Sequence, residues 1–406
     1  MKVQERFLKY VSYWTTSSED EVTIPSTKRQ FDLAYELEKE MKEMGLSKVI
    51  CDEHCYVYGL LPATKGYEQK KAIGFIAHVD TAPSFSGEHV NPVLIPDYDE
   101  TDVRLSATGD VLKVSDFPQL ATRKGQTLIV TDGTTLLGAD DKAGVAEILT
   151  AVEQIIKEEI PHGDIWIGFT PDEEVGVGSH KFDLDYFKAD YAYTVDGDYE
   201  GEIAYENFNA ASAEFSIKGV NVHPGSAKNI MINAASVACE LQCMLPETQT
   251  PEHTEAREGF FHLCDMTGDV SAAKLHYIIR DHDKDLFSEK KEFLQNVTDF
   301  LNKKYGEDTV TLKLSESYHN MLEIMEDNFF IVEKAQDAIR AVGLEPISRP
   351  VRGGTDGAQL SFKGLPCPNL GTGGDGFHGP LEHITVEGME TAVKVIVEIV
   401  KNPVDK

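Results

Sequence analysis

Residues 72–83 read AIGFIAHVDTAP, and the rest of the chain is organised around this stretch. The run 72–77 is continuously apolar and predicts a buried strand. His78 and Asp80 are two residues apart, so along a continuing strand they would project from the same face. A carboxylate beside an imidazole can accept its N–H and raise its basicity as a metal ligand. A hydrogen-bonded histidine at a strand end is the alternative interpretation.

Apolar strands and amphipathic helices alternate through the first half of the chain. Residues 165–169 and 191–195 are continuously apolar, and residues 142–158 keep the 3.6-residue helical period. This order predicts an α/β domain with a mixed, mostly parallel sheet covered by helices. Further helices are expected at 2–14, 28–44, 327–342 and 386–401, a strand pair at 49–61, and loops with short strands at 84–126.

The pattern changes near residue 208. Strands with alternating burial are expected at 211–218, 260–266, 273–280 and 309–314, with helices at 229–244 and 284–304. The order βαββαβ is that of a ferredoxin-like α+β sandwich. We therefore predict an inserted domain at 208–316 and a discontinuous main domain formed by 1–207 and 317–406.

Composition excludes several classes of partner. The chain has 406 residues and a formal net charge of −31, which should repel nucleic acid and anionic membrane surfaces. No segment approaches the roughly 20 apolar residues of a membrane span. The six cysteines form no CxxC pair, and residues 1–14 lack the apolar core of a signal peptide. These features predict a reduced, cytoplasmic location.

Acidic and histidine residues follow several of the predicted strands. Besides His78, these are Asp140/Asp141, Glu173/Glu174, Asp196 and His378. Each of these positions also has an ordinary structural interpretation, such as a helix cap or a turn. In an open α/β sheet, however, the loops beyond the carboxyl ends of the strands converge on one crevice. We therefore expect these side chains to meet.

Several carboxylates cannot share a crevice as bare anions, because like charges repel at short range. Protons or bound cations must neutralise them. His, Asp and Glu ligands without Cys suit Zn²⁺, Mn²⁺ or Co²⁺. Two such ions, about 3.5–4 Å apart, would need a bridging carboxylate. Of two adjacent glutamates, one can bind metal while its neighbour takes a proton from the attacking water.

Seven motifs together resemble the M20 metallopeptidases over essentially the whole chain. They are AHVDT (77–81), GADDKAG (138–144), FTPDEEVGVGS (169–179), TVDGD (194–198), KGVNVHPGSAKN (218–229), RGGTDGAQLSF (352–362) and GTGGDGFHG (371–379). The resemblance implies two zinc ions, with Mn²⁺ or Co²⁺ as possible substitutes. Asp140 would bridge them, His78 and Asp196 would hold one, and Glu174 and His378 would hold the other.

The same resemblance implies roles around the metals. Glu173 would be the general base and Asp80 would orient His78. His223 would help to stabilise the oxyanion, from the partner subunit of a homodimer. Asn233 would contact the peptide backbone, and Arg280 and Arg352 would hold the substrate's carboxylate. The inserted domain would act as a lid and dimerisation domain.

The expected activity is that of a tripeptide aminopeptidase, which removes the N-terminal residue from short peptides with a free amine. Another M20-type hydrolase, namely a dipeptidase, a carboxypeptidase or an N-acyl amino acid deacylase, is the first alternative. A catalytically silent metal- or peptide-binding protein on the same fold is the second. The presence of Glu173 argues against the silent protein, because such a protein needs no base.

Overall fold

The computed structural model describes residues 1–406, which form two compact units. The first unit contains Met1–Tyr205, Glu323–Arg349 and Thr355–Lys406, and the second contains Glu206–Leu322 and Pro350–Gly354. The chain passes from the second unit into the first through α6 (Leu322–Met325). The predicted insertion, residues 208–316, lies within the second unit.

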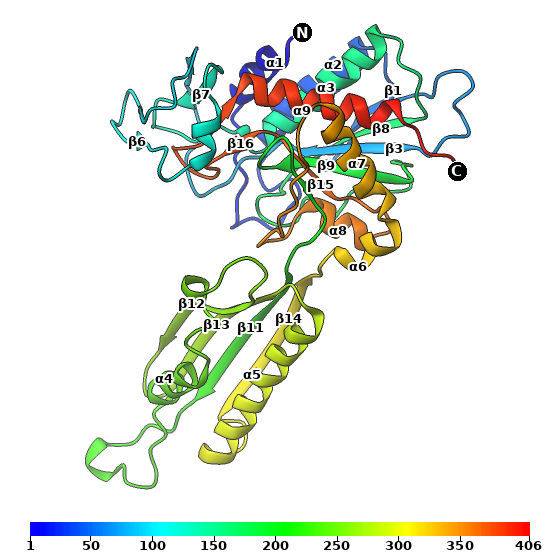
Figure 1. Ribbon diagram of the computed structural model, residues 1–406. Helices are drawn as coiled ribbons and strands as arrows, with labels where there is room; N and C mark the ends of the chain where they lie inside the picture. The colour runs from blue at the N-terminus through cyan, green and yellow to red at the C-terminus, as the bar shows by residue number, and fades with distance from the viewer. The chain divides into compact units, whose positions relative to one another are not determined.

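A seven-stranded sheet with the order β1-β2-β8-β3-β9-β15-β10 forms the centre of the first unit (Figure 1). Its strands are β1 (Ser47–Cys51), β2 (Val57–Leu61), β3 (Ile73–His78), β8 (Ile165–Thr170), β9 (Tyr191–Gly197), β10 (Ile203–Ala204) and β15 (Asn369–Gly371). The four strands β8, β3, β9 and β15 run parallel, and β1, β2 and β10 pair antiparallel at the edges. Three of these parallel strands, β3, β8 and β9, contain the continuously apolar runs, as expected for strands buried on both faces.

Helices cover both faces of this sheet. On β3, Phe75 and Ala77 pack in a core that includes residues of α1, α2, α3, α7 and α9, whereas Ile76 faces the opposite side with Trp166 and with Leu360 of α8. The helices are α1 (Val3–Val11), α2 (Gln30–Glu43), α3 (Ala139–Lys157), α7 (Phe330–Ala341), α8 (Asp356–Phe362) and α9 (Val386–Lys401), with the 3₁₀ turns η1 (Pro118–Thr122) and η4 (Glu326–Asn328). The alternation along β3 follows from the two-residue period of a strand.

A second, antiparallel sheet of the first unit has the order β16-β17-β7-β4. Its strands are β4 (Pro92–Ile95), β7 (Leu128–Thr131), β16 (Gly374–Asp375) and β17 (His383–Thr385), and a separate pair is formed by β5 (Val103–Arg104) and β6 (Val111–Leu112). A core of its own lies here, with Leu112, Leu120 and Leu128 among its buried residues. The sheet joins the segment after β3 to the Gly-rich segment near the C-terminus.

The second unit is a four-stranded antiparallel sheet with the order β12-β13-β11-β14 and two helices. Its elements are β11 (Asn209–Lys218), η2 (Pro224–Ser226), α4 (Ala234–Met244), η3 (Pro251–His253), β12 (Phe260–Gly268), β13 (Ala272–Asp281), α5 (Lys284–Tyr305) and β14 (Val310–Tyr318). Phe215 and Ile217 of β11 are buried, and the residues between and after them are exposed. This is the βαββαβ arrangement, so the predicted fold class is confirmed for both units.

Most of the helix boundaries differ from the sequence-based expectation by one to five residues, and two of them bear on the candidate site residues. The helix expected at 229–244 begins at Ala234, because the Asn233 side chain accepts the N–H of Ser236 and caps its first turn. The helix expected at 142–158 begins at Ala139, although Asp140 and Asp141 lie outside helical φ/ψ. None of the helices combines the length and the apolar character that a membrane crossing requires.

Candidate metal centre and active site

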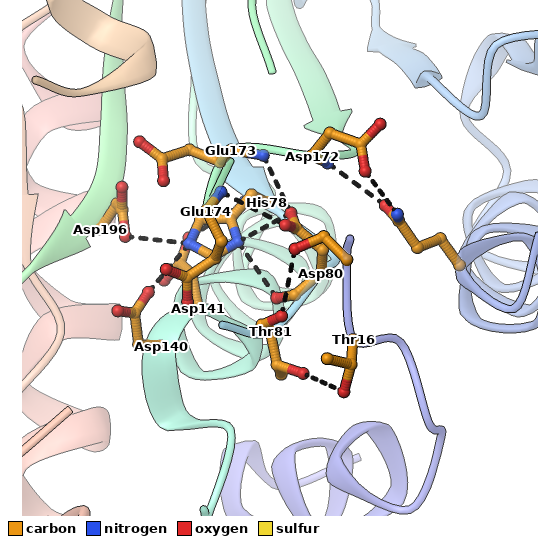
Figure 2. A network of polar contacts seen from close by, with 12 residues as sticks. Thr16, His78, Asp80, Thr81, Asp140, Asp141, Asp172, Glu173, Glu174 and Asp196 are labelled. Atoms are coloured by element: carbon orange, nitrogen blue, oxygen red, sulfur yellow. Dashed lines mark hydrogen bonds and ion pairs between the residues drawn. The ribbon is translucent and has the colours of Figure 1, made fainter. Parts of the chain in front are cut away.

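The carboxyl ends of the parallel strands carry the candidate residues. His78 is the last residue of β3, Glu173 and Glu174 follow β8, and Asp196 lies near the end of β9. Asp140 enters from the start of α3, and His378 from the loop between β16 and β17. These side chains come together at one site, and Figure 2 shows all of them except His378.

Asp140 lies between the two histidines. Its Oδ1 is 2.8 Å from Nε2 of His78, and its Oδ2 is 3.0 Å from Nε2 of His378. On one side, Asp196 Oδ1 is 3.4 Å from Nε2 of His78. On the other side, Glu174 Oε2 is 2.9 Å from Nε2 of His378. Each oxygen of Asp140 thus meets one imidazole, and each imidazole has a further carboxylate of its own.

Asp80 contacts two of the ligand-bearing segments. Its Oδ1 is 3.3 Å from Nδ1 of His78, the ring nitrogen opposite the one that faces Asp140. Its two oxygens also accept the main-chain N–H groups of Glu173 at 3.1 Å and Glu174 at 3.2 Å (Figure 2). The sequence suggested the contact with His78 but not the contacts with the glutamate segment.

Two further carboxylates belong to the site: Asp141, which the sequence placed among the candidates without assigning it a role, and Glu382, which the sequence analysis missed. Asp141 is buried, and its Oδ2 accepts the main-chain N–H of His78 at 3.1 Å. Glu382 is buried and accepts the N–H groups of Leu137, Gly138 and Asp140 at 2.7–2.9 Å. Asp141 stands beside Asp140 in the sequence, whereas the only sequence clue to Glu382 was its position four residues after His378.

Burial and opposite charges shift the pKa values of these groups. Burial lowers the pKa of His78, but the carboxylates of Asp196 and Asp140 outweigh it, and the pKa stands well above its usual value. Hydrogen bonds to Asp140 and Glu174 raise the pKa of His378 to about 11. Burial raises the pKa of Glu174 to about 8 and that of Asp196 to about 6. The crowded carboxylates therefore favour bound positive charge, whether protons or cations.

The donor set fits divalent cations. Two groups of three ligand atoms lie within 4.8 Å of one another, one from His78, Asp141 and Asp196, the other from His78, Asp140 and Glu174. Buried Oε1 of Glu174 and Oδ1 of Asp141 have no hydrogen-bond partner in the protein. Because such an orphaned carboxylate oxygen is costly to bury, it indicates a ligand of opposite charge.

His223 and Asn233 lie in the second unit and contact their own main chain. His223 is exposed, and its Nδ1 accepts the N–H of Gly225 at 3.1 Å, at the start of η2. Asn233 is the cap of α4. Both contacts are local, so neither shows by itself what else these side chains bind.

Arg280 and Arg352 also lie in the second unit and differ in how fully they are engaged. Arg280 donates through one nitrogen to the carbonyls of Ala211 at 3.3 Å and Ile279 at 3.0 Å. Arg352 donates through two nitrogens to main-chain carbonyls of the segment 254–258 and to the Thr254 hydroxyl. Arg352 therefore fastens this segment, whereas Arg280 keeps donors to spare.

Comparison with known proteins shows the family. Residues 131–402 match the peptidase family M20/M25/M40. The chain belongs to peptidase family M20. It is 54% identical over 402 residues to Peptidase T of Caldanaerobacter subterraneus subsp. tengcongensis, with 98% of each chain covered. The resemblance predicted from the seven motifs is thus confirmed, and the chain is a peptidase of this family.

Solved structures agree on the fold of this M20 peptidase. Aminopeptidase PepT from Bacillus cereus aligns with a TM-score of 0.78 and 23% identity, over 98% of this chain and 97% of that one. A tripeptidase from Staphylococcus aureus subsp. aureus Mu50 aligns with a TM-score of 0.78 and 21% identity, over the same shares. Both likenesses concern the whole fold, the sheet domain and the ferredoxin-like unit together.

Proposed function

We propose that this M20 peptidase is a tripeptide aminopeptidase with a two-metal centre. The observation that carries the proposal is the position of Asp140, whose two oxygens face two different histidines. The high identity to Peptidase T and the fold shared with a tripeptidase support the substrate class. The free α-amine of a short peptide is a cation, which suits a crevice rich in carboxylates.

The residues divide into two ligand groups around Asp140. His78 and Asp196 would hold one ion, Glu174 and His378 would hold the other, and Asp140 would bridge. Zinc fits these nitrogen and oxygen donors, and Mn²⁺ or Co²⁺ are possible substitutes. When bound, such ions supply Lewis-acid polarisation of the scissile carbonyl and make water acidic enough to lose a proton near neutral pH.

Glu173 is the proposed general base. Its main-chain N–H donates to Oδ1 of Asp80 at 3.1 Å (Figure 2). Burial and the nearby Asp196 raise the pKa of Glu173 well above its usual value, which is the direction that strengthens a carboxylate as a base. Glu173 would accept a proton from the attacking water and deliver it to the leaving amine.

Four residues of the second unit are proposed to bind the substrate. His223 would stabilise the oxyanion, Asn233 would contact the peptide backbone, and Arg280 and Arg352 would bind the substrate's terminal carboxylate. The spare donors of Arg280 support its part in this carboxylate site. The proposal includes a homodimer in which this unit acts as a lid, and light scattering of the purified protein tests the dimer.

Substitution of Glu173 tests the assignment of the base. Glu173→Ala should lower kcat by about 10²–10⁴-fold, because the proton acceptor is lost, and should leave metal content nearly intact. Glu174→Ala is the matched neighbour, and it should lower metal content as well. Metal analysis and steady-state kinetics give both readouts. If Glu173→Ala loses metal and Glu174→Ala keeps it, the two roles are reversed.

Product analysis tests the substrate class. Metal-loaded protein receives a free tripeptide, its N-acetylated form, its C-terminal amide and a dipeptide, and mass spectrometry identifies the products. We expect only the free tripeptide to be cut efficiently, with loss of its first residue. Equal cleavage of the acetylated peptide would refute the aminopeptidase and favour a deacylase or carboxypeptidase. No cleavage by a fully metal-loaded protein would refute the enzyme itself.

A further inference from the structure

The segment Thr15–Gln30, which we call the N-terminal strap, connects α1 to α2 and reaches the candidate active site. Near its start it lies along Thr81, the residue that follows Asp80. Thr16 and Thr81 share a hydrogen bond between their hydroxyl groups at 3.1 Å (Figure 2). Ser17 donates its N–H and its hydroxyl to the carbonyl of Thr81. The strap thus fixes the main chain next to Asp80.

The end of the strap holds Asp172, the residue before Glu173. The carboxylate of Asp172 accepts the N–H and the hydroxyl of Ser26 and the side-chain amide of Gln30, each at 2.6 Å. In return, Oε1 of Gln30 accepts the main-chain N–H of Asp172 at 3.2 Å. Asp172 and Gln30 are fully buried, and Ser26 is nearly so. Charge-assisted contacts of this kind are short and strong.

The two ends of the strap are tied to each other. Thr27 donates its hydroxyl to the carbonyl of Thr16 at 2.8 Å, and Ser18 donates its N–H to the hydroxyl of Ser26 at 2.9 Å. Meanwhile Asp80 accepts the N–H of Glu173. A closed circuit of contacts therefore runs from Asp80 through Thr81, the strap and Asp172 to Glu173.

Asp172 needs such support because of its own backbone. Its φ is +57°, in the left-handed region, which costs most residues with a side chain about 1–2 kcal/mol and which aspartate adopts more readily when its short side chain is hydrogen-bonded. The main chain enters the glutamate pair directly from this residue, so the direction of Glu173 depends on Asp172 keeping this conformation. A shift of about 1 Å in a catalytic group can lower a rate about 100-fold.

We infer that the N-terminal strap positions the general base, with Ser26 and Gln30 acting as positioning residues through Asp172. The inference rests on the proposed role of Glu173. Neither residue touches the reacting atoms. Their contribution is to hold Asp172, and with it the peptide from which the Glu173 side chain projects.

The test compares strap variants of the metal-loaded, full-length enzyme. Gln30→Leu removes both contacts between the side-chain amide and Asp172, and we expect kcat to fall about 10–100-fold with KM and metal content unchanged. Ser26→Ala is the milder variant, in case Gln30→Leu does not fold, and should lower kcat several-fold. Glu38→Ala is the control, because Glu38 lies on the same helix as Gln30 but accepts the N–H of Cys51 in β1 instead.

Asp172→Asn separates a positioning role from a general loss of stability. If Ser26 acts through Asp172, Ser26→Ala should lower kcat much less in the Asp172→Asn background than in the wild type. The inference is overturned if the strap variants keep wild-type kcat, if Glu38→Ala lowers kcat as much, or if the effects of Ser26→Ala and Asp172→Asn simply multiply. Activity retained by Glu173→Ala would instead refute the proposed base, whatever the strap variants do.

Discussion

Gly144→Ala should weaken metal binding without touching any proposed ligand. Gly144 lies on α3, where a Cβ atom would stand 1.9 Å from the carbonyl oxygen of Val195 and 2.5 Å from Oδ1 of Asp141. Carbon and carbonyl oxygen rarely approach closer than about 3.3 Å. The helix and β9 would therefore have to separate by about 1.4 Å, and Val195 is the residue before Asp196.

The magnitude follows from two opposing effects. Alanine favours the helix by about 1 kcal/mol over glycine, whereas overpacking of a tight core costs about 1–3 kcal/mol. The net change in the free energy of unfolding is thus small, between zero and about 2 kcal/mol of destabilisation. Displacement of Asp141 and Asp196 should be felt more at the metal site, where disturbed support of the ligands typically costs 10–100-fold in affinity.

Zinc titration against a chelator buffer and urea unfolding measure the two quantities separately. Gln154→Ala is the matched control, because it places alanine on the same helix at a half-exposed position. We expect Gly144→Ala to bind zinc 10–100-fold more weakly and the control to bind it normally. Wild-type zinc affinity for Gly144→Ala would refute the reasoning, whatever the urea midpoint, because it would mean that α3 and β9 accommodate the Cβ atom without moving the ligands.

Two further predictions concern buried charges of the first unit. Burial, with the charge of Asp198 as the next cause, raises the pKa of Glu202 to about 7. The folded protein therefore holds this proton more tightly than the unfolded chain does. The stability that the carboxyl contributes is present at low pH and is lost as the pH rises from about 4.5 to 7. Between pH 4.5 and 8, the free energy of unfolding of Glu202→Gln should therefore rise by on the order of 3 kcal/mol relative to that of the wild type, as measured by urea unfolding. A difference in the free energy of unfolding that does not change with pH would contradict this. Arg123 donates to both oxygens of Glu200 at 2.5 and 2.7 Å, and both side chains are buried. Arg123→Met alone should therefore lower the free energy of unfolding by about 3–5 kcal/mol, because it leaves Glu200 buried and unpaired, whereas Arg123→Met with Glu200→Leu should lower it less. Additive losses would argue against a coupled pair.

The sequence predicted the parts of the fold that local patterns determine. Strands β3, β8 and β9 were visible as apolar runs, and the ferredoxin-like order followed from alternation. The sheet β16-β17-β7-β4 was not predicted, because β7 and β17 pair across about 250 residues and are short. The segment Pro350–Gly354 groups with the second unit for a similar reason, since Val351 bonds to the carbonyl of Glu206.

In the candidate site too, contacts between segments far apart in the sequence could not be predicted. Candidate metal ligands have a recognisable residue type, and His78, Glu174 and Asp196 also lie at strand ends, so they could be proposed from sequence. Glu382 could not, because its partners are main-chain N–H groups some 240 residues away, and a peptide N–H has no residue type. The role of Asp172 was not predicted either, because its partners Ser26 and Gln30 lie more than 140 residues earlier in the sequence.

Asp80, Asp172 and Glu382 together indicate how the acidic residues of the candidate metal site are kept in place. A carboxylate that binds a cation must leave its oxygens free, so its orientation has to come from its main chain. Asp80 binds the N–H groups of the glutamate segment, and Glu382 binds those of the segment that carries Asp140. These supporting carboxylates place negative charge on peptide donors, where each hydrogen bond offsets part of the cost of burial. The net charge of −31 therefore need not be fully balanced by basic side chains, since peptide N–H groups and cations can share that task.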